Sequence, residues 1–225
     1  MKFYDPSRKH HSSRERETMS VNETVAGGSA SKIDTKLKPK DLITIGIFTA
    51  IYVVLSSIPG MLAIIPIFVP LAAVLVPLLG GIPVMYLIAK VHKFGALVIL
   101  FTLVGLFMLV GGMGYFSLFT CIICAIIAEL ILRSGNYQSM RKATLAYAVT
   151  GMWIIGNFMP FVFTRDSFLA QQAANYGTDY ANALSGLMSP WIIPLLVVVA
   201  FVSGLAGAAI GKRIYRKHFE RAGIA

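Results

Sequence analysis

The first long apolar run of the chain covers residues 42–58 and contains no charged side chain. As an α-helix rising about 1.5 Å per residue, it nearly crosses a hydrocarbon core about 30 Å thick. We interpret it as the first membrane helix. Residues 1–41 before it are polar and rich in Ser, Thr, Lys, Arg and Glu. This composition predicts a disordered cytoplasmic tail, within which either Met1 or Met19 can be the start of the natural chain.

Five further apolar runs follow the first. The Ser, Pro and Gly residues at 56–60 predict a turn after the first helix, with a loop or re-entrant piece at about 59–65. Residues 61–89 then predict one kinked crossing, because a straight helix of that length would span roughly 43 Å. The other predicted crossings are residues 94–110, 115–132, 144–163 and 190–211.

The basic residues give this layout an orientation. With six crossings, ten Lys and Arg residues after position 41 fall on the side of the N-terminal tail, and only Arg165 falls on the other. Since basic residues accumulate on the cytoplasmic side, both termini are expected in the cytoplasm. The predicted fold is an all-α integral membrane bundle. It comprises a tail (1–41), a six-helix membrane domain (42–213) with an outer loop at 164–189, and a basic tail (214–225).

Composition supports the same class. The chain has 225 residues, of which 56% are hydrophobic, and a net charge of +10. A basic protein can bind nucleic acid, but here the bases cluster at the ends of apolar runs, as topology signals do. We therefore expect the lipid bilayer, and no nucleic acid, as a partner.

We find no motif for catalysis, so the chain is not expected to be an enzyme or to hold a cofactor or metal. Cys121 and Cys124 form a CxxC inside an apolar run without histidines at the same depth, which favours helix packing over zinc. Glu129 is a carboxylate within a crossing, where acids are often functional. Arg133 lies four residues later, and we favour a local ion pair between them.

The outer loop has an apolar stripe at helical spacing. Its positions are Leu169, Ala173, Tyr176, Tyr180, Leu184 and Leu187. The stripe predicts a helix, bent at Gly177, that either lies on the membrane surface or covers an outward-facing pocket. The sequence leaves both interpretations open.

The outer part of the predicted fifth crossing contains a lone amide, Asn157, among aromatic residues. A buried amide needs a partner, which is either another helix or a ligand. Apolar walls with few polar anchors are typical of small-molecule sites. The candidate substrate-binding residues are Tyr115, Trp153, Asn157, Phe161, Tyr176 and Tyr180. The alternative is that the aromatic residues form an interface belt and the amide joins two helices.

The first membrane helix has a second feature, a face of small residues. Its members are Gly46, Thr49, Ala50 and Val53. Such a face lets another helix backbone come close, either from a partner protein or from this same chain.

The order of these features resembles the substrate-binding S components of energy-coupling factor (ECF) vitamin transporters, and most closely their MptD-type or Trep_Strep group. The resemblance covers about residues 36–218, from KLKPKDLITIGIFTAIYVV through the proline-rich run to AIIAELILRSG. It implies a six-helix bundle in the bacterial cell membrane that binds a micronutrient on its outer face. It also implies docking, through an Ala-xxx-Ala contact read here as Gly46 and Ala50, on a coupling subunit driven by an ATPase pair.

The sequence therefore predicts the substrate-capturing subunit of an ATP-driven importer for a small, mostly neutral or zwitterionic molecule. The alternative is a self-sufficient secondary carrier or channel for a small solute. Such a carrier would normally show an internal repeat or paired intramembrane ions, and neither is visible in the sequence.

Overall fold

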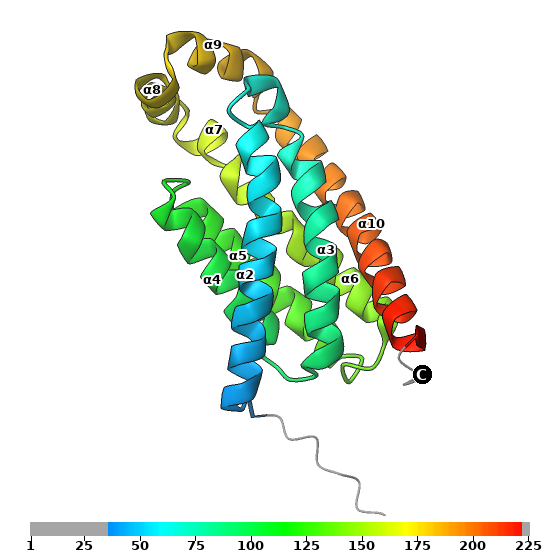
Figure 1. Ribbon diagram of the computed structural model, residues 1–225. Coiled ribbons are helices and arrows are strands. Elements are labelled where there is room, and N and C mark those ends of the chain that lie inside the picture. Colours follow the sequence, from blue (N-terminus) through cyan, green and yellow to red (C-terminus); the bar gives the residue numbers. More distant parts are fainter. Residues whose placement is uncertain (1–35, 222–225) are drawn as a thin grey trace, which may run out of the picture. The chain divides into compact units, whose positions relative to one another are not determined.

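The computed structural model describes residues 36–221, with side chains to residue 217, and its regular elements are all helices. Six helices form an up-and-down bundle (Figure 1): α2 (Pro39–Leu62), α3 (Ala72–Lys90), α4 (Ala96–Val110), α5 (Tyr115–Arg133), α6 (Met140–Gly151) and α10 (Ile192–Arg221). Residues 1–35 of the tail predicted at 1–41 lie outside the described residues, and α2 begins at Pro39, before the predicted end of that tail. Toward the other terminus, α10 continues from the predicted sixth crossing into the segment assigned to a basic tail.

Four helices within the described residues are long and apolar enough to cross a membrane, namely α2, α3, α5 and α10. The fourth predicted crossing coincides with α5 to within one residue. The third predicted crossing corresponds to α4, a helix of only 15 residues. The predicted fifth crossing, residues 144–163, is not one helix but α6, the 3-10 helix η2 (Met152–Asn157) and α7 (Pro160–Phe163).

The break in this segment follows from its close contact with α5. A β-carbon added at Gly156 would lie 2.7 Å from the Ser117 Cα atom, so glycine lets η2 touch the backbone of α5. The Thr120 hydroxyl donates to the Trp153 carbonyl oxygen at 2.9 Å, and Pro160 has no N–H to continue the helical pattern. At the break, the Thr120 hydroxyl of α5 therefore replaces the backbone N–H that would donate to the Trp153 carbonyl oxygen in a continuous helix.

The turn predicted at residues 56–60 is wrong, since α2 continues through Pro59 to Leu62. Pro59 is buried, and the Ser57 hydroxyl donates to the Val53 carbonyl oxygen at 2.8 Å. Membrane helices tolerate such residues when neighbours pack around them. The chain turns instead after Leu62 and enters α3 through the 3-10 helix η1 (Pro66–Phe68).

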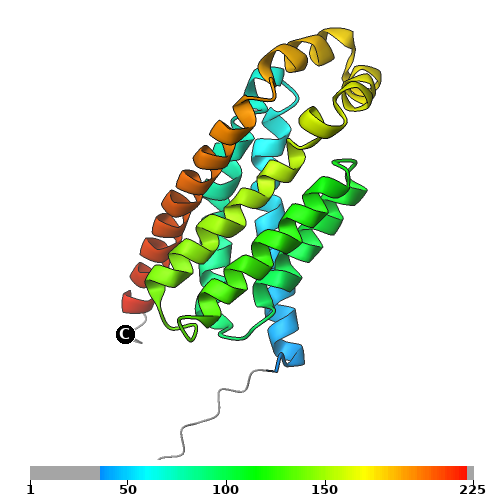
Figure 2. The same cartoon turned by 180° about the vertical axis from the view of Figure 1, so that it is seen from behind.

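The closest helix packing joins α3 and α10, which lie side by side in both views (Figures 1 and 2). Gly81 faces Gly207 and Gly211 backbone to backbone, and a β-carbon at Gly207 would lie 2.8 Å from the Leu78 carbonyl oxygen. A small-residue face was predicted on the first helix only, and this contact was missed. The spacing of Gly204, Gly207 and Gly211 was the available signal.

The two ends of the bundle differ in charge. Every Lys and Arg with a described side chain, except Arg165, lies at the end where α3 finishes and α6 starts, which we call the basic end (Figure 1). Lys93 and Asp41 form an ion pair there at 2.7 Å.

Glu129 does not pair with Arg133, so the ion pair predicted from their spacing is wrong. The fully buried Glu129 side chain accepts the N–H groups of Gly95 at 3.0 Å and Leu97 at 2.8 Å, and the Tyr137 hydroxyl at 3.0 Å. These N–H groups belong to the first turn of α4, where backbone donors have no helical acceptor. Arg133 is exposed. Glu129 is therefore a cap for a neighbouring helix.

We predict that Glu129→Ala destabilises the fold by about 2–5 kcal/mol, because two buried N–H groups lose their acceptor. Glu129→Gln keeps an acceptor oxygen and should lose less. Thermal unfolding of the purified protein in detergent measures both variants. Equal melting temperatures for Glu129→Ala and the wild type would contradict the capping role.

Gly207→Ala is expected to destabilise the fold by about 1–3 kcal/mol, because the added methyl group overlaps the α3 backbone. Gly46→Ala is the matched control, since no atom lies within 4 Å of its added β-carbon. In the helix it should be neutral or stabilise by up to about 1 kcal/mol. Melting temperatures of the two variants check the contrast, and similar values would show that the α3–α10 contact can relax.

Candidate binding cavity

Two short helices cover the end of the bundle opposite the basic end. They are α8 (Arg165–Tyr176) and α9 (Thr178–Leu187), which form the α8–α9 hairpin (Figures 1 and 2). The chain bends between them at Gly177, which has φ +94°. The sequence predicted this bend, and a left-handed φ explains why glycine occupies the position.

Two sets of hydrogen bonds hold the hairpin in place. The Arg165 guanidinium donates to the carbonyl oxygens of Met188 at 2.6 Å and Ser185 at 2.7 Å, which ties the start of α8 to the end of α9. The Tyr180 hydroxyl donates to the Ala63 carbonyl oxygen at 2.8 Å and so ties α9 to the turn after α2. Burial, and then the neighbouring Tyr176, raise the pKa of Tyr180, so its hydroxyl stays protonated at neutral pH.

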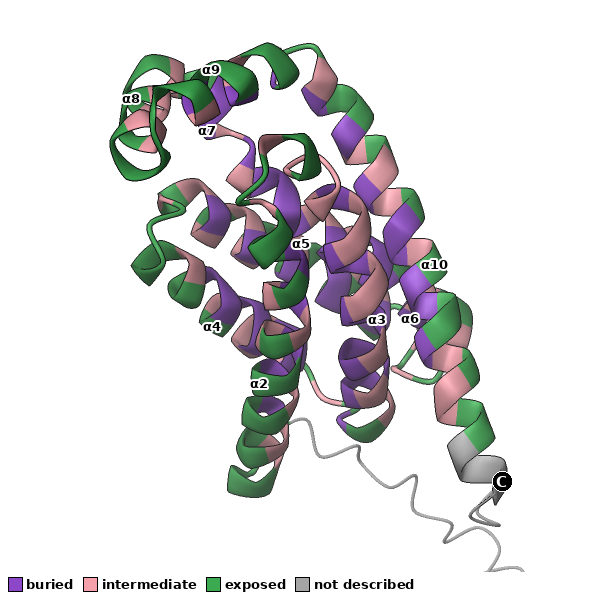
Figure 3. Cartoon of the chain, turned by 45° about the horizontal axis from the view of Figure 1, so that its top comes forward, coloured by how far each residue is buried: buried purple, intermediate pink, exposed green. Residues whose placement is uncertain are grey.

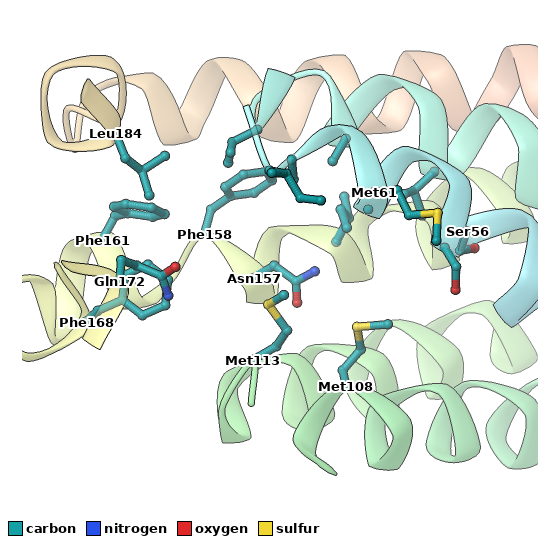
Figure 4. Close-up of a pocket in the computed structure, with 18 of the residues that line it drawn as sticks. Ser56, Met61, Met108, Met113, Asn157, Phe158, Phe161, Phe168, Gln172 and Leu184 are labelled. Carbon is teal, nitrogen blue, oxygen red and sulfur yellow. The ribbon is translucent and has the colours of Figure 1, made fainter. Parts of the chain in front are cut away.

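A cavity of about 430 Å³ lies between the hairpin and the bundle (Figure 4). This volume is within the range of small-molecule sites. Its wall comes from α2, the following turn, α3, α4, η2, α7 and the hairpin, and none of its residues is charged. They are Ser56, Ser57, Gly60, Met61, Ala63, Ile64, Val69, Ala72, Val76, Met108, Met113, Trp153, Ile154, Asn157, Phe158, Phe161, Phe168, Gln172, Tyr176, Tyr180 and Leu184.

Five of the six residues proposed from the sequence line this cavity: Trp153, Asn157, Phe161, Tyr176 and Tyr180. Tyr115 does not. It contributes to a neighbouring cavity of about 190 Å³ and is 53% exposed, with its ring 4.4 Å from that of Phe116. Both Trp153 and Phe161 are almost fully buried, which excludes a lipid-facing aromatic belt for these two residues.

The floor of the cavity is held by polar contacts between helices. The Trp153 indole N–H donates to the Tyr52 hydroxyl at 2.6 Å, and the Tyr52 ring packs edge-on against Phe101 at 5.4 Å. The Ser117 hydroxyl donates to Asn157 Oδ1. The Asn157 amide therefore joins η2 to α5 through its oxygen. Its nitrogen makes no hydrogen bond to the described residues and remains for another partner.

Sequence reasoning missed several residues of the wall, notably Ser56, Met61, Met108 and Gln172. Ser56 was assigned to a turn, whereas it lies in the continued α2. Nothing in the sequence marks Met61 or Met108 as wall residues, and only the fold brings them to the same cavity as Asn157 (Figure 4). Off-stripe polar positions of α8 were the one available signal for Gln172.

The small-residue face of α2 is narrower than the sequence indicated. Gly46 and Ala50 are exposed, but Val53 is half-buried. Thr49 is buried inside the bundle, where its hydroxyl donates to the Ile45 carbonyl oxygen at 2.8 Å. The accessible face of α2 (Figure 3) thus consists of Gly46 and Ala50 between bulky apolar residues. These are Ile43, Ile47, Ile51, Val54 and Ile58.

The helices and their apolar surfaces define an all-helical bacterial integral membrane protein. More narrowly, residues 39–221 match the family described as hypothetical bacterial integral membrane protein (Trep_Strep), and the chain belongs to that family. No curated protein and no solved structure matches the chain.

We predict that Tyr180→Phe loosens the hairpin by about 0.5–1.5 kcal/mol, because α9 loses its hydrogen bond to the α2–α3 turn. Hydrogen–deuterium exchange should become faster at residues 178–187. Tyr176→Phe is the matched control, since its hydroxyl makes no hydrogen bond within the described part of the chain. Equal exchange in both variants would show that this bond does not hold the hairpin.

Proposed function

We propose that this protein is the substrate-binding subunit of an ECF-type ATP-driven importer in the bacterial cell membrane. It captures a small micronutrient in the cavity below the α8–α9 hairpin and takes no catalytic role itself. The observation that carries the proposal is this covered, uncharged cavity at the end of the bundle opposite the basic end. Family membership and the resemblance to S components support it.

The distribution of charge supports an outward-facing cavity. The basic end corresponds to the cytoplasmic side under the positive-inside rule, so the hairpin end faces the exterior. In this proposal the segment from α6 through η2 to α7 crosses as one broken unit, and α4 crosses as a short helix. Six crossings then leave both termini in the cytoplasm.

The source of energy is proposed to be a partner. In a proton-coupled mechanism, Glu129 would be the first candidate for the proton-carrying acid. Both of its carboxylate oxygens, however, already accept hydrogen bonds, from the backbone at the start of α4 and from Tyr137. We therefore assign the driving force to ATP hydrolysis in an associated ATPase pair, transmitted through an ECF coupling subunit.

Docking is assigned to the exposed face of α2. A β-carbon at Gly46 would meet no atom within 4 Å, so a partner backbone can approach there without rearrangement of this chain. The flanking Ile43, Ile47 and Val54 side chains supply apolar contact on either side of the small residues. Thr49, being buried, supports the helix from within.

A self-sufficient carrier is the second candidate, and one observation favours it. The α6–η2–α7 segment is discontinuous at the cavity, and broken helices line the substrate sites of many secondary transporters. This model predicts uptake by proteoliposomes that contain the protein alone. The importer model predicts uptake only when the coupling subunit and ATPases are added with ATP.

We predict that the protein co-purifies with a coexpressed ECF coupling subunit and ATPase pair, and that Gly46→Leu/Ala50→Leu abolishes this association. The reason is that two bulky side chains close the approach on α2, while the cavity residues are unchanged. Ile47→Leu, on the same exposed face, is the matched control and should assemble normally. Normal assembly of the double variant, with an unchanged melting temperature, would refute docking at this face.

A further inference from the structure

We propose that the cavity selects an uncharged molecule with an apolar body and a hydrogen-bonding group that reaches Ser56. This inference deepens the proposed function and rests on the cavity being its substrate site. In Figure 4, Ser56 lies at the end of the cavity away from Phe161 and Leu184, with Asn157 between them. The ligand therefore has its first polar group at the Ser56 end and can have a second beside Asn157.

The Ser56 hydroxyl is a buried polar group without a hydrogen-bond partner. The residue is 6% exposed, and its oxygen is the one buried side-chain polar atom among the described residues that lacks a partner. The Tyr52 hydroxyl is close enough for a weak hydrogen-bonding interaction with Ser56, but the pair does not meet the distance and angles of an ordinary hydrogen bond. Such a group costs stability unless a ligand supplies the missing bond.

The other hydroxyl side chains of α2, apart from those of tyrosine, all have a hydrogen-bond partner, unlike Ser56. The hydroxyls of Thr44, Thr49 and Ser57 donate to the carbonyl oxygen four residues earlier, at 3.0, 2.8 and 2.8 Å. Serine and threonine in membrane helices commonly make this bond. Ser56 has the same geometric opportunity at the Tyr52 carbonyl oxygen and does not use it. Because Ser56 lines the cavity, this unused hydroxyl lies next to the space that a ligand would occupy.

The charge of the ligand follows from the rest of the wall. Its polar side chains are neutral hydroxyls and amides, from Ser56, Ser57, Asn157, Gln172, Tyr176 and Tyr180. An ionised group placed there would lose its water without gaining an opposite charge. Arg165, the cation at this end of the bundle, is engaged by Ser185 and Met188 and is not part of the wall. The site therefore disfavours anions, cations and zwitterions alike.

The remaining wall favours a flat or irregular apolar body. Trp153, Phe158 and Phe161 provide rigid aromatic surfaces, whereas Met61 and Met108 are flexible thioethers that adapt to the shape of a ligand. The Asn157 nitrogen is a free donor beside them. A neutral heteroaromatic molecule satisfies all of these features.

Four probes with related bodies test the inference on the purified full-length protein by isothermal titration calorimetry. Indole is neutral with one N–H donor, naphthalene has no polar group, and tryptamine and indole-3-acetate carry opposite charges at neutral pH. We expect indole to bind most tightly, and both charged probes to bind at least about tenfold more weakly. Ser56→Ala should weaken indole binding about two- to tenfold and leave naphthalene unchanged.

Ser57→Ala is the matched control, because its hydroxyl lines the same cavity but is already bonded to the Val53 carbonyl oxygen. It should bind indole as the wild type does. Equal binding of a charged probe would overturn the selection for neutral ligands, and an unchanged indole affinity in Ser56→Ala would overturn the anchor. Failure of all four probes at millimolar concentration would overturn both. No coupling subunit is present, so these results are independent of whether the protein assembles with an energy module.

Discussion

The structure depends on the absence of water in a membrane interior, because a polar group there is satisfied only by the protein itself or by a bound ligand. The Trp153 indole N–H donates to the Tyr52 hydroxyl, and the Tyr147 hydroxyl donates to the Pro77 carbonyl oxygen at 2.6 Å. Glu129 accepts hydrogen bonds from N–H groups at the start of α4 that have no helical acceptor. Each of these bonds joins elements far apart in the sequence, so polar satisfaction also fixes which helices are neighbours. In apolar surroundings, where helices gain little from hydrophobic association, such bonds and close packing determine the arrangement.

The cavity is a consequence of the same contacts. Gly156 brings η2 against α5, and the resulting break turns Trp153 and Asn157 toward the space below the hairpin. On the other side, Gly81 and Gly207 hold α3 and α10 in backbone contact. The α3–α10 contact and the contact of η2 with α5 therefore have the same physical basis, because glycine lets two backbones approach closely in both places. The cavity beside η2 is covered by the hairpin, which Arg165 and Tyr180 hold in place.

The sequence predicted much of this arrangement, for reasons that can be given residue by residue. Long apolar runs predict helices such as α5 because the surrounding lipid, rather than a contact with a distant part of the chain, favours a helix there. The apolar stripe around Gly177 and the aromatic neighbours of Asn157 likewise predicted several of the residues that line the cavity. The effect of helix-breaking residues was harder to predict, since Pro59 and Pro160 have opposite outcomes. The helix α2 continues through Pro59, whereas α6 has already ended at Gly151, nine residues before Pro160. That difference arises from contacts with other helices, which one sequence does not display. Glu129 was misassigned for the same reason, because Arg133 is near in sequence whereas Gly95 and Leu97 are near only in the fold.

α2 links the two roles proposed for this protein, since it carries Ser56 on its buried face and Gly46 on its exposed face. Ten residues separate these positions, or about 15 Å along the helix axis. In the proposed importer, a ligand at Ser56 and a coupling subunit at Gly46 thus contact different faces of one rigid element. A partner that shifts α2 would change the wall of the cavity directly, without a signal through the rest of the bundle. The Tyr180–Ala63 bond extends this connection to the α8–α9 hairpin, because Ala63 directly follows the last residue of α2. Movement of α2 would therefore act on the floor and the cover of the cavity together, which is the mechanical requirement for releasing a ligand from a covered site.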